Sequence, residues 1–154
     1  MEISLGDIFT SDTILMDIAS TTKEDVFSEL ADAIKAVHPE SDKKVILAAL
    51  WEREKKLSTG ITSGVAIPHA ICSGIGTTAG ALGISRAGIE YDALDKKPVH
   101  VIFMLVMGDG TRENHPRILE RIFSLVRTEA LALIKNAENA QNVHAVLSRF
   151  SLKP

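Results

Sequence analysis

The sequence predicts an α/β protein, a three-layer α/β/α sandwich in which helices flank a mixed β-sheet. Two observations favour this class. Segments with helical hydrophobic spacing alternate along the chain with short apolar runs that are typical of strands. One run, residues 99–107, is almost entirely apolar, as expected for a strand that helices cover on both faces. Because no linker, internal repeat or low-complexity segment stands out in the 154 residues, we expect a single domain over residues 1–154.

The first half of the chain predicts two helices. Thr21 and Glu24 form a capping-box pattern that opens the first helix. Apolar residues then recur at spacings of three and four, at Val26, Leu30, Ile34 and Val37. His38 precedes a proline, and this position disfavours helical backbone, so the helix ends there. Ser41 or Asp42 caps a second helix that continues to about residue 56.

The strands and the later helices follow from the same two periods. Strands are expected at residues 13–18, 65–67, 81–86 and 99–107, with a flexible loop over 70–80 and a turn-rich link over 88–97. Asn114 is a fair N-cap and Pro116 suits a first helical turn, so a helix is expected to begin there and to reach residue 126. A last helical region, residues 129–150, is expected to break near 136–139.

The composition is that of an ordinary globular protein. Hydrophobic residues make up 45% and charged residues 24%, and the net charge of −3 does not favour a nucleic-acid partner. The longest apolar run, residues 101–107, is too short to span a bilayer, so any role at a membrane is expected to pass through a transporter partner. One cysteine, Cys72, allows no intramolecular disulfide, and residues 1–4 lack the features of a signal peptide. We therefore expect a cytoplasmic protein.

Residues 53–69 contain the candidate functional site. Arg53 lies near a helix end, small residues form a loop, and a short strand stops at Pro68 and presents His69. Neutral imidazole is a good nucleophile near pH 7, and an arginine fork matches phosphate oxygens. Glycines such as Gly60 let backbone N–H groups cradle an anion. From the residues alone, a role as a strand-end residue is favoured for His69, and a role as a helix-end cation is favoured for Arg53.

Three motifs resemble the enzyme IIA family of the bacterial phosphotransferase system, of the fructose/mannitol/nitrogen-regulatory type. Residues 52–54, 58–61 and 64–69 follow the pattern E-R-E-x-x-x-S-T-G-I-G-x-G-x-A-I-P-H-G. Residues 91–99 resemble F-D-A-L-D-x-K-P-V, and His115 falls where the family has its second histidine. The resemblance covers essentially the whole chain. The chain departs from the family pattern at Thr62, Ser63, Ala70 and Pro116, and Thr62 and Ala70 replace glycine.

The resemblance implies a phosphohistidine phosphocarrier with the α/β/α architecture. His69 would accept a phosphoryl group from phospho-HPr or a nitrogen-type paralogue, hold it on Nε2 and pass it to an enzyme IIB during sugar uptake. His115 would bind the phosphoryl oxygens or orient the ring, and Arg53 would offset the transferring charge. The phosphate-binding residues would be Ser58, Thr59 and Gly60. Neither a metal nor a cofactor is implied.

Two other hypotheses remain open. A regulatory protein of the nitrogen branch would act through phosphorylation-dependent binding of target proteins. A metal-dependent or nucleotide-using enzyme is the third hypothesis. It draws on the glycines at 74, 76 and 80, which resemble a dinucleotide-binding loop, and on the pair His69 and Cys72, which resembles part of a zinc site. The strand expected at 81–86 argues against the dinucleotide loop, because such a loop must open a helix.

Overall fold

A computed structural model describes residues 3–108 and 110–152 of the chain. The helices are α1 (Leu5–Ile8), α2 (Lys23–Val37), α3 (Lys43–Lys56), α4 (His115–Val126), α5 (Ala130–Lys135) and α6 (Ala140–Leu147). The strands are β1 (Ile3–Ser4), β2 (Ile14–Leu15), β3 (Val65–Ala66), β4 (His69–Ile71), β5 (Thr78–Ile89), β6 (Val99–Met107) and β7 (Ser151–Leu152). Two 3-10 turns, η1 (Ser11–Thr13) and η2 (Arg112–Asn114), precede β2 and α4.

The main sheet is mixed, and β6 is its central strand. Its order is β2-β5-β6-β3, and β4 pairs with the same edge of β6 beyond β3. β5 runs antiparallel to β6, whereas the β2–β5, β3–β6 and β4–β6 pairs are parallel. A separate two-stranded sheet pairs β1 with β7 near the two chain ends. The predicted mixed sheet is confirmed.

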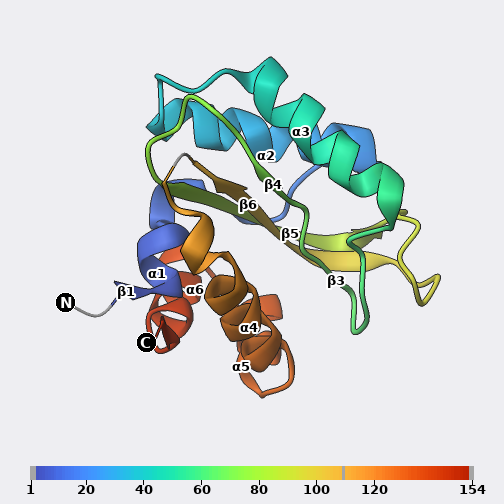
Figure 1. Cartoon of the computed structure of the whole chain (residues 1–154). Coiled ribbons are helices and arrows are strands. Elements are labelled where there is room, and N and C mark those ends of the chain that lie inside the picture. The colour runs from blue at the N-terminus through green and yellow to red at the C-terminus, as the bar shows by residue number, and fades with distance from the viewer. Residues whose placement is uncertain (1–2, 109, 153–154) are drawn as a thin grey trace.

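Helices cover both faces of this sheet (Figure 1). α2 and α3 lie over one face, and α1, α4, α5 and α6 lie over the other. Side chains of β6 alternate between the two cores because successive strand residues point to opposite faces. Phe103 and Leu105 pack into one core, and Ile102 and Met104 into the other. The three-layer α/β/α prediction is confirmed, and no helix within residues 3–108 and 110–152 is long and apolar enough to cross a membrane.

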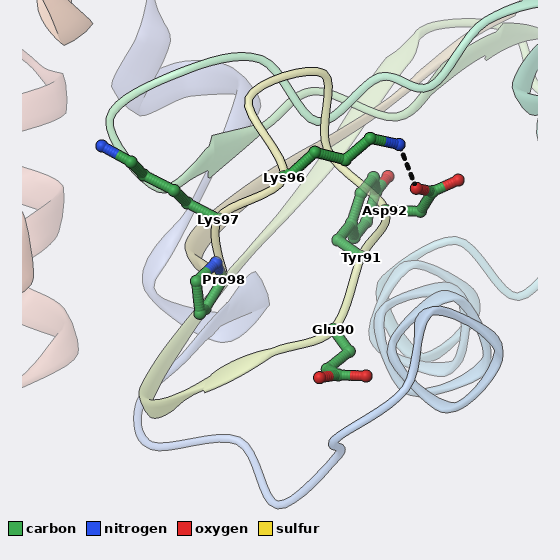
Figure 2. Close-up of a pocket in the computed structure, with 6 residues that line it drawn as sticks. All are labelled: Glu90, Tyr91, Asp92, Lys96, Lys97 and Pro98. Atoms are coloured by element: carbon green, nitrogen blue, oxygen red, sulfur yellow. Dashed lines mark hydrogen bonds and ion pairs between the residues drawn. The ribbon is translucent and has the colours of Figure 1, made fainter.

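The link between β5 and β6 folds into a turn that borders a hollow of about 370 Å³ (Figure 2). Asp92 and Lys96 both have positive φ angles, 59° and 63°, and the Lys96 ammonium lies 2.9 Å from an Asp92 carboxylate oxygen. Tyr91 is fully buried beneath this exposed turn. The link therefore joins a solvent-facing turn to a buried aromatic side chain.

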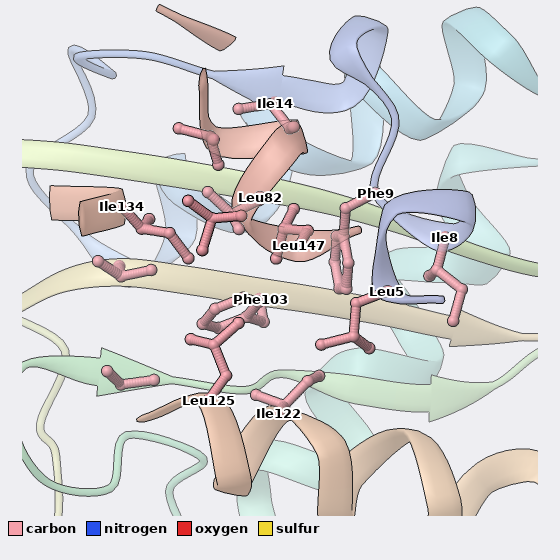
Figure 3. Packing of buried hydrophobic residues seen from close by; sticks show 14 of the residues in the cluster. Leu5, Ile8, Phe9, Ile14, Leu82, Phe103, Ile122, Leu125, Ile134 and Leu147 are labelled. Atoms are coloured by element: carbon pink, nitrogen blue, oxygen red, sulfur yellow. The ribbon is translucent and has the colours of Figure 1, made fainter. Parts of the chain in front are cut away.

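The core on the α4 side packs around an aromatic pair (Figure 3). Phe9 and Phe103 meet edge to face, with ring centroids 5.6 Å apart and an interplanar angle of 77°. This is a favoured geometry for two aromatic quadrupoles. Leu82, Ile122 and Leu125 surround the pair and are fully buried. The core thus fixes β6, the strand on which the neighbouring β4 is aligned.

The structure corrects several predicted boundaries. The strand expected at 13–18 is limited to Ile14–Leu15, because a 3-10 turn precedes it and Asp17, at φ 51°, ends the extended backbone. The first long helix is capped by Thr22 rather than Thr21, since the Thr22 hydroxyl accepts the Asp25 N–H at 3.2 Å. Asp42 caps α3, as one of the two predicted alternatives.

The loop expected over 70–80 is also wrong in part. Its first residues form β4, and its last residues begin β5, which extends from 78 to 89 instead of 81–86. Both extensions pair with β6, so tertiary pairing overrides the weak strand propensity of a glycine-rich segment. The predicted break near 136–139 separates α5 from α6, where the Asn139 side chain caps α6.

Replacing Asp42 with alanine tests the cap of α3. The Asp42 carboxylate accepts the Lys44 N–H at 2.9 Å, and its loss leaves a first-turn donor without this partner. We expect the free energy of unfolding to fall by about 0.5–2 kcal/mol, measured by urea denaturation. Asp12→Ala changes an exposed aspartate that caps no helix and should alter stability by less than about 0.5 kcal/mol. Equal losses in both variants would contradict the assigned cap.

Candidate functional site

Arg53, His69 and His115 line one pocket of about 420 Å³. They come from the last turn of α3, the first residue of β4 and the first residue of α4. The wall is completed by Ala49, Glu52, Lys56, Ala70 and Ile71. The three residues lie 16 and 46 positions apart in the chain, so only the fold brings them together.

The backbone around His69 is fixed by pairing with β6. His69 is aligned with Leu105, whose N–H donates to the Pro68 carbonyl at 2.9 Å. The His69 Nδ1 lies 2.7 Å from the Ile67 carbonyl oxygen. A carbonyl oxygen only accepts hydrogen bonds, so Nδ1 carries the proton. In the neutral ring the lone pair is therefore on Nε2, which makes Nε2 the nucleophilic atom.

His115 lies beside this ring at the N-terminus of α4. The two imidazole centroids are 5.2 Å apart, and the ring planes meet at 72°. Helix N-termini favour anions because their first N–H groups and the helix dipole point outward. Asn114 occupies the N-cap position as predicted, but its side chain makes no capping hydrogen bond. An anion next to His69 would therefore meet both His115 and the positive end of a helix.

Arg53 is held at the end of α3 by its own chain. One guanidinium nitrogen, Nη1, donates to the Leu57 carbonyl oxygen at 2.8 Å. Leu57 is the C-cap of the helix, so Arg53 also satisfies a terminal carbonyl group. This bond uses one of its five donors and leaves the remainder of the fork available to the pocket.

The environment favours the neutral form of both histidines. Burial lowers the pKa of His69; the hydrogen bond to Ile67 opposes this shift, and the charges of Arg53 and His115 reinforce it. Burial also lowers the pKa of His115, with a further contribution from Arg53. A neutral ring keeps the Nε2 lone pair, so both shifts preserve a nucleophile at neutral pH.

The titration of His69 provides a test of this environment. Because the pKa of His69 lies below 6.5, more than half of the rings should remain neutral at pH 6.5. We expect a ¹H–¹⁵N NMR titration of the ring to give a midpoint below that pH. Arg53→Gln removes a nearby positive charge and should move the midpoint upward. A wild-type midpoint at or above 6.5 would contradict the assigned environment.

Ser58, Thr59 and Gly60 do not line the pocket. Thr59 is buried and bonded to Glu54, and the Ser58 hydroxyl accepts the Gly60 N–H at 3.2 Å. A Cβ on Gly60 would lie 2.7 Å from Ala93, so glycine is required here for close packing. Phosphate binding by these three residues stays a prediction.

The two substitutions for glycine keep ordinary backbone geometry. Near the loop, the positive φ angles belong to Ser63, at 60°, and Gly64, at 74°, and not to Thr62 or Ala70. Neither Thr62 nor Ala70 therefore needs the conformational freedom of glycine. The strained position is Ser63, and the carbonyl of the next residue, Gly64, accepts hydrogen bonds from the backbone N–H groups of residues 100 and 101.

The two alternative motifs lie in different surroundings. The glycines at 74–80 lead into β5, so the segment lacks the helix that a dinucleotide-binding loop requires. Cys72 is buried, and burial raises the pKa of its thiol. Across the described part of the chain, no group of three or more His, Cys, Asp or Glu side chains is placed to hold a metal ion.

Glu54 is a residue whose importance the sequence alone did not reveal. Its side chain is buried, although it directly follows Arg53, which lines the pocket. Its place in the E-R-E motif was the available signal. A glutamate in a charged helix end is ordinarily exposed, so only the three-dimensional packing identifies it as buried.

The chain was compared with protein-family models and with curated proteins. The family model of the phosphoenolpyruvate-dependent sugar phosphotransferase system, EIIA 2, matches residues 7–150. Among curated relatives, the fructose-specific EIIABC component of Bacillus subtilis is 32% identical over 84% of this chain. The chain spans 20% of that protein's length, so it corresponds to one part of it.

Two other relatives match along nearly their whole length. A nitrogen regulatory protein of Pseudomonas aeruginosa is 30% identical, with 94% of this chain and 95% of that protein covered. The fructose-specific EIIA component of Haloferax volcanii is 31% identical, with 94% of each chain covered. The chain is thus similar to proteins named for two different branches.

Solved structures share the fold. The nitrogen regulatory protein IIA-Ntr of Neisseria meningitidis superposes with a TM-score of 0.81 at 28% identity, covering 93% of this chain and 98% of that one. The Escherichia coli mannitol enzyme IIA, solved in complex with phosphorylated enzyme IIB, gives a TM-score of 0.76 at 12% identity, with 92% and 99% covered. At that identity the likeness concerns the fold alone.

Proposed function

Since the chain belongs to the EIIA 2 family of the phosphoenolpyruvate-dependent sugar phosphotransferase system, we propose that it is a phosphocarrier that acts through His69. It takes a phosphoryl group from the phosphohistidine of HPr or a nitrogen-type paralogue. It then passes the group to an enzyme IIB during sugar uptake. The solved mannitol complex pairs an enzyme IIA of this fold with phosphorylated enzyme IIB, which supports an enzyme IIB as the acceptor.

The hydrogen bond from His69 Nδ1 to the Ile67 carbonyl supports the proposal most directly. It commits one ring nitrogen to the backbone and leaves the Nε2 lone pair as the nucleophile. His69, Arg53 and His115 also line a common pocket, where a phosphoryl group would meet positive charge and a helix N-terminus. Phosphoryl transfer depends mainly on such positioning and electrostatic stabilisation.

The transfer balances in two steps. First, the Nε2 lone pair of His69 forms a bond to the phosphorus of the donor phosphohistidine. The P–N bond to the donor breaks, and its electron pair returns to the donor ring. Second, a cysteine thiolate or the lone pair of a neutral histidine of the acceptor attacks the same phosphorus, and the electron pair of the His69 P–N bond returns to Nε2.

The other site residues have assigned roles in this proposal. Arg53 offsets the negative charge of the transferring group, and His115 binds its oxygens or orients the His69 ring. Ser58 and Gly60 remain candidates for phosphate binding through their loop, whereas Thr59 is buried and both of its donors are bonded to Glu54. The proposed roles require neither a metal nor a cofactor.

A second function is a regulatory one. The match to nitrogen regulatory proteins over nearly their whole length and the TM-score of 0.81 with IIA-Ntr favour it specifically. In this case the phosphorylation state of His69 would control which target proteins bind to the surface around its pocket. The chemistry at His69 is the same in both functions, and only the acceptor differs.

Incubation with phosphoenolpyruvate, enzyme I and HPr tests the phosphocarrier function. Intact-mass spectrometry should show an acid-labile gain of one phosphoryl group, and added enzyme IIB should remove it. A parallel reaction with the nitrogen-type paralogue of HPr compares the two branches by rate. Absence of the gain with both donors would contradict the proposed function.

A further inference from the structure

Glu54, which follows the pocket residue Arg53 in the chain, accepts hydrogen bonds from several neighbours in the interior. It is 7% exposed, and its Oε2 accepts the Thr59 N–H and the Lys23 ammonium, each at 2.9 Å. Its Oε1 accepts the Thr59 hydroxyl at 2.6 Å. The carboxylate thus holds both donors of Thr59 at once. Charge-assisted bonds of this kind are stronger than neutral ones.

Tyr91 completes the network from the other side. Its hydroxyl lies 2.7 Å from the Thr59 oxygen, whose own proton is used on Glu54, so Tyr91 is the donor. Burial raises the pKa of Tyr91 well above its ordinary value, which keeps this proton on the phenol. Lys23 lies 4.4 Å from the centre of the Tyr91 ring. Tyr91 is also the buried end of the link that borders the hollow in Figure 2.

Thr59 connects this network to His69 through the backbone. Its carbonyl oxygen accepts the Ile67 N–H at 2.9 Å. The Ile67 carbonyl in turn accepts the proton of His69 Nδ1 at 2.7 Å. Hydrogen bonds and the backbone of Thr59 and Ile67 therefore connect the buried carboxylate of Glu54 to the imidazole ring.

The same network bears on Arg53. Its guanidinium donates to the carbonyl of Leu57, which lies two residues before Thr59. When Glu54 fixes Thr59, it also limits the movement of the Leu57 carbonyl. One buried carboxylate thus constrains the backbone groups that orient both pocket residues.

We propose that Glu54 and Thr59 are positioning residues, whose hydrogen bonds hold the Ile67 and Leu57 carbonyls where they orient His69 and Arg53. The functional consequence rests on the proposed phosphocarrier activity. A buried charge adds little stability compared with apolar packing, so its presence here fits a geometric role. Supporting shells of this kind hold a site within the small tolerance that transfer requires.

Thr59→Val tests the role, because valine keeps the shape and the N–H but removes the hydroxyl. Thr59→Ser restores the hydroxyl. Thr13→Val is the matched control, because Thr13 is 2% exposed and lies outside the pocket. Its hydroxyl donates to the Thr10 carbonyl oxygen and accepts the Thr10 N–H. Both valine variants lose a buried hydroxyl, and their melting temperatures are measured alongside.

Two readouts separate positioning from general destabilisation. The ¹⁵N spectrum of the unphosphorylated His69 ring reports whether Nδ1 alone carries the proton. Initial rates of phosphoryl uptake at varied HPr concentration separate kcat from KM. We expect Thr59→Val to give a mixture of ring tautomers and to lower kcat about tenfold without raising KM, in line with losses of supporting residues elsewhere. Thr59→Ser and Thr13→Val should match the wild type in both readouts.

An unchanged ¹⁵N spectrum and rate in Thr59→Val would overturn the proposal, and so would an equal change in Thr13→Val. Where Thr59→Val does not fold, Glu54→Gln replaces it, because glutamine removes the charge and one of the two acceptor oxygens. The same spectral change is then expected. The ¹⁵N measurement needs no phosphoryl donor. If the wild-type protein takes up no phosphoryl group, the proposed function is contradicted. The ¹⁵N spectra of the variants still decide whether Glu54 and Thr59 position the His69 ring.

Discussion

Replacing His69 with alanine is expected to abolish phosphoryl uptake. Alanine has no lone pair to attack phosphorus, and the pocket would retain only Arg53 and His115. Loss of a covalent nucleophile lowers the rate by more than about a thousandfold, because the binding and electrostatic groups that remain in the pocket cannot replace the attacking atom. Intact-mass spectrometry after incubation with phosphoenolpyruvate, enzyme I and HPr should therefore show no gain.

His100→Ala is the matched control for this substitution. The His100 Nδ1 also donates to a backbone carbonyl, that of Ser85, at 2.8 Å, and the side chain is likewise half-buried. It lies outside the pocket, so its loss should leave uptake intact. Uptake at the wild-type rate by His69→Ala would refute the assignment of the nucleophile.

Replacing Arg53 with glutamine is expected to slow uptake without abolishing it. Glutamine keeps a polar side chain of similar length but removes the charge that faces the transferring group. Losing one preorganised electrostatic partner costs about 10²–10³ in kcat, or about 2.7–4 kcal/mol of transition-state stabilisation. Rapid-quench experiments with phosphorylated HPr measure this rate of phosphoryl uptake directly.

The arginine prediction has two controls. Arg53→Lys keeps the charge but loses the planar fork, so its rate should lie between those of wild type and Arg53→Gln. Lys56→Gln removes a cation from the same helix and the same pocket wall, and we expect it to change the rate less than threefold or so. An equal loss in Lys56→Gln and Arg53→Gln would mean that general positive charge, rather than Arg53, supports transfer.

Much of the fold was predictable because local signals agreed with the global structure. The apolar run at 99–107 is β6, with the bounds expected from the sequence. Val26, Leu30 and Ile34 of the predicted α2 stripe are buried, whereas Val37 in the last turn is 38% exposed. The second helix through residue 56 was also confirmed. Where a segment is long enough to repeat its buried positions, the spacing of its apolar residues indicates the element and the face that packs.

The missed elements have no such pattern. α1 is four residues long, and β1 and β7 have two residues each, too few for a period to emerge. β4 lies in a segment that was expected to be a flexible loop, and only its pairing with β6 defines it. Long-range pairing of short segments is not encoded in local spacing.

The candidate site was likewise predictable in part. His69, Arg53 and His115 were predicted by chemistry and by motif, and the fold brings them to one pocket. The hydrogen bonds that connect Thr59 with Glu54 and Ile67 could not be predicted, because they depend on which side chains and carbonyls become buried. A sequence motif names the residues of a site, but not the network that orients them.

The atom that carries the phosphoryl group provides the most direct test of the account. ³¹P–¹⁵N coupling, measured by NMR on enzymatically phosphorylated, ¹⁵N-histidine-labelled protein, identifies that nitrogen. Because the Ile67 carbonyl holds the proton of Nδ1, we predict a coupling to Nε2 of His69. A phosphoryl group on Nδ1 of His69, or on His115, would contradict the geometry from which the mechanism is derived.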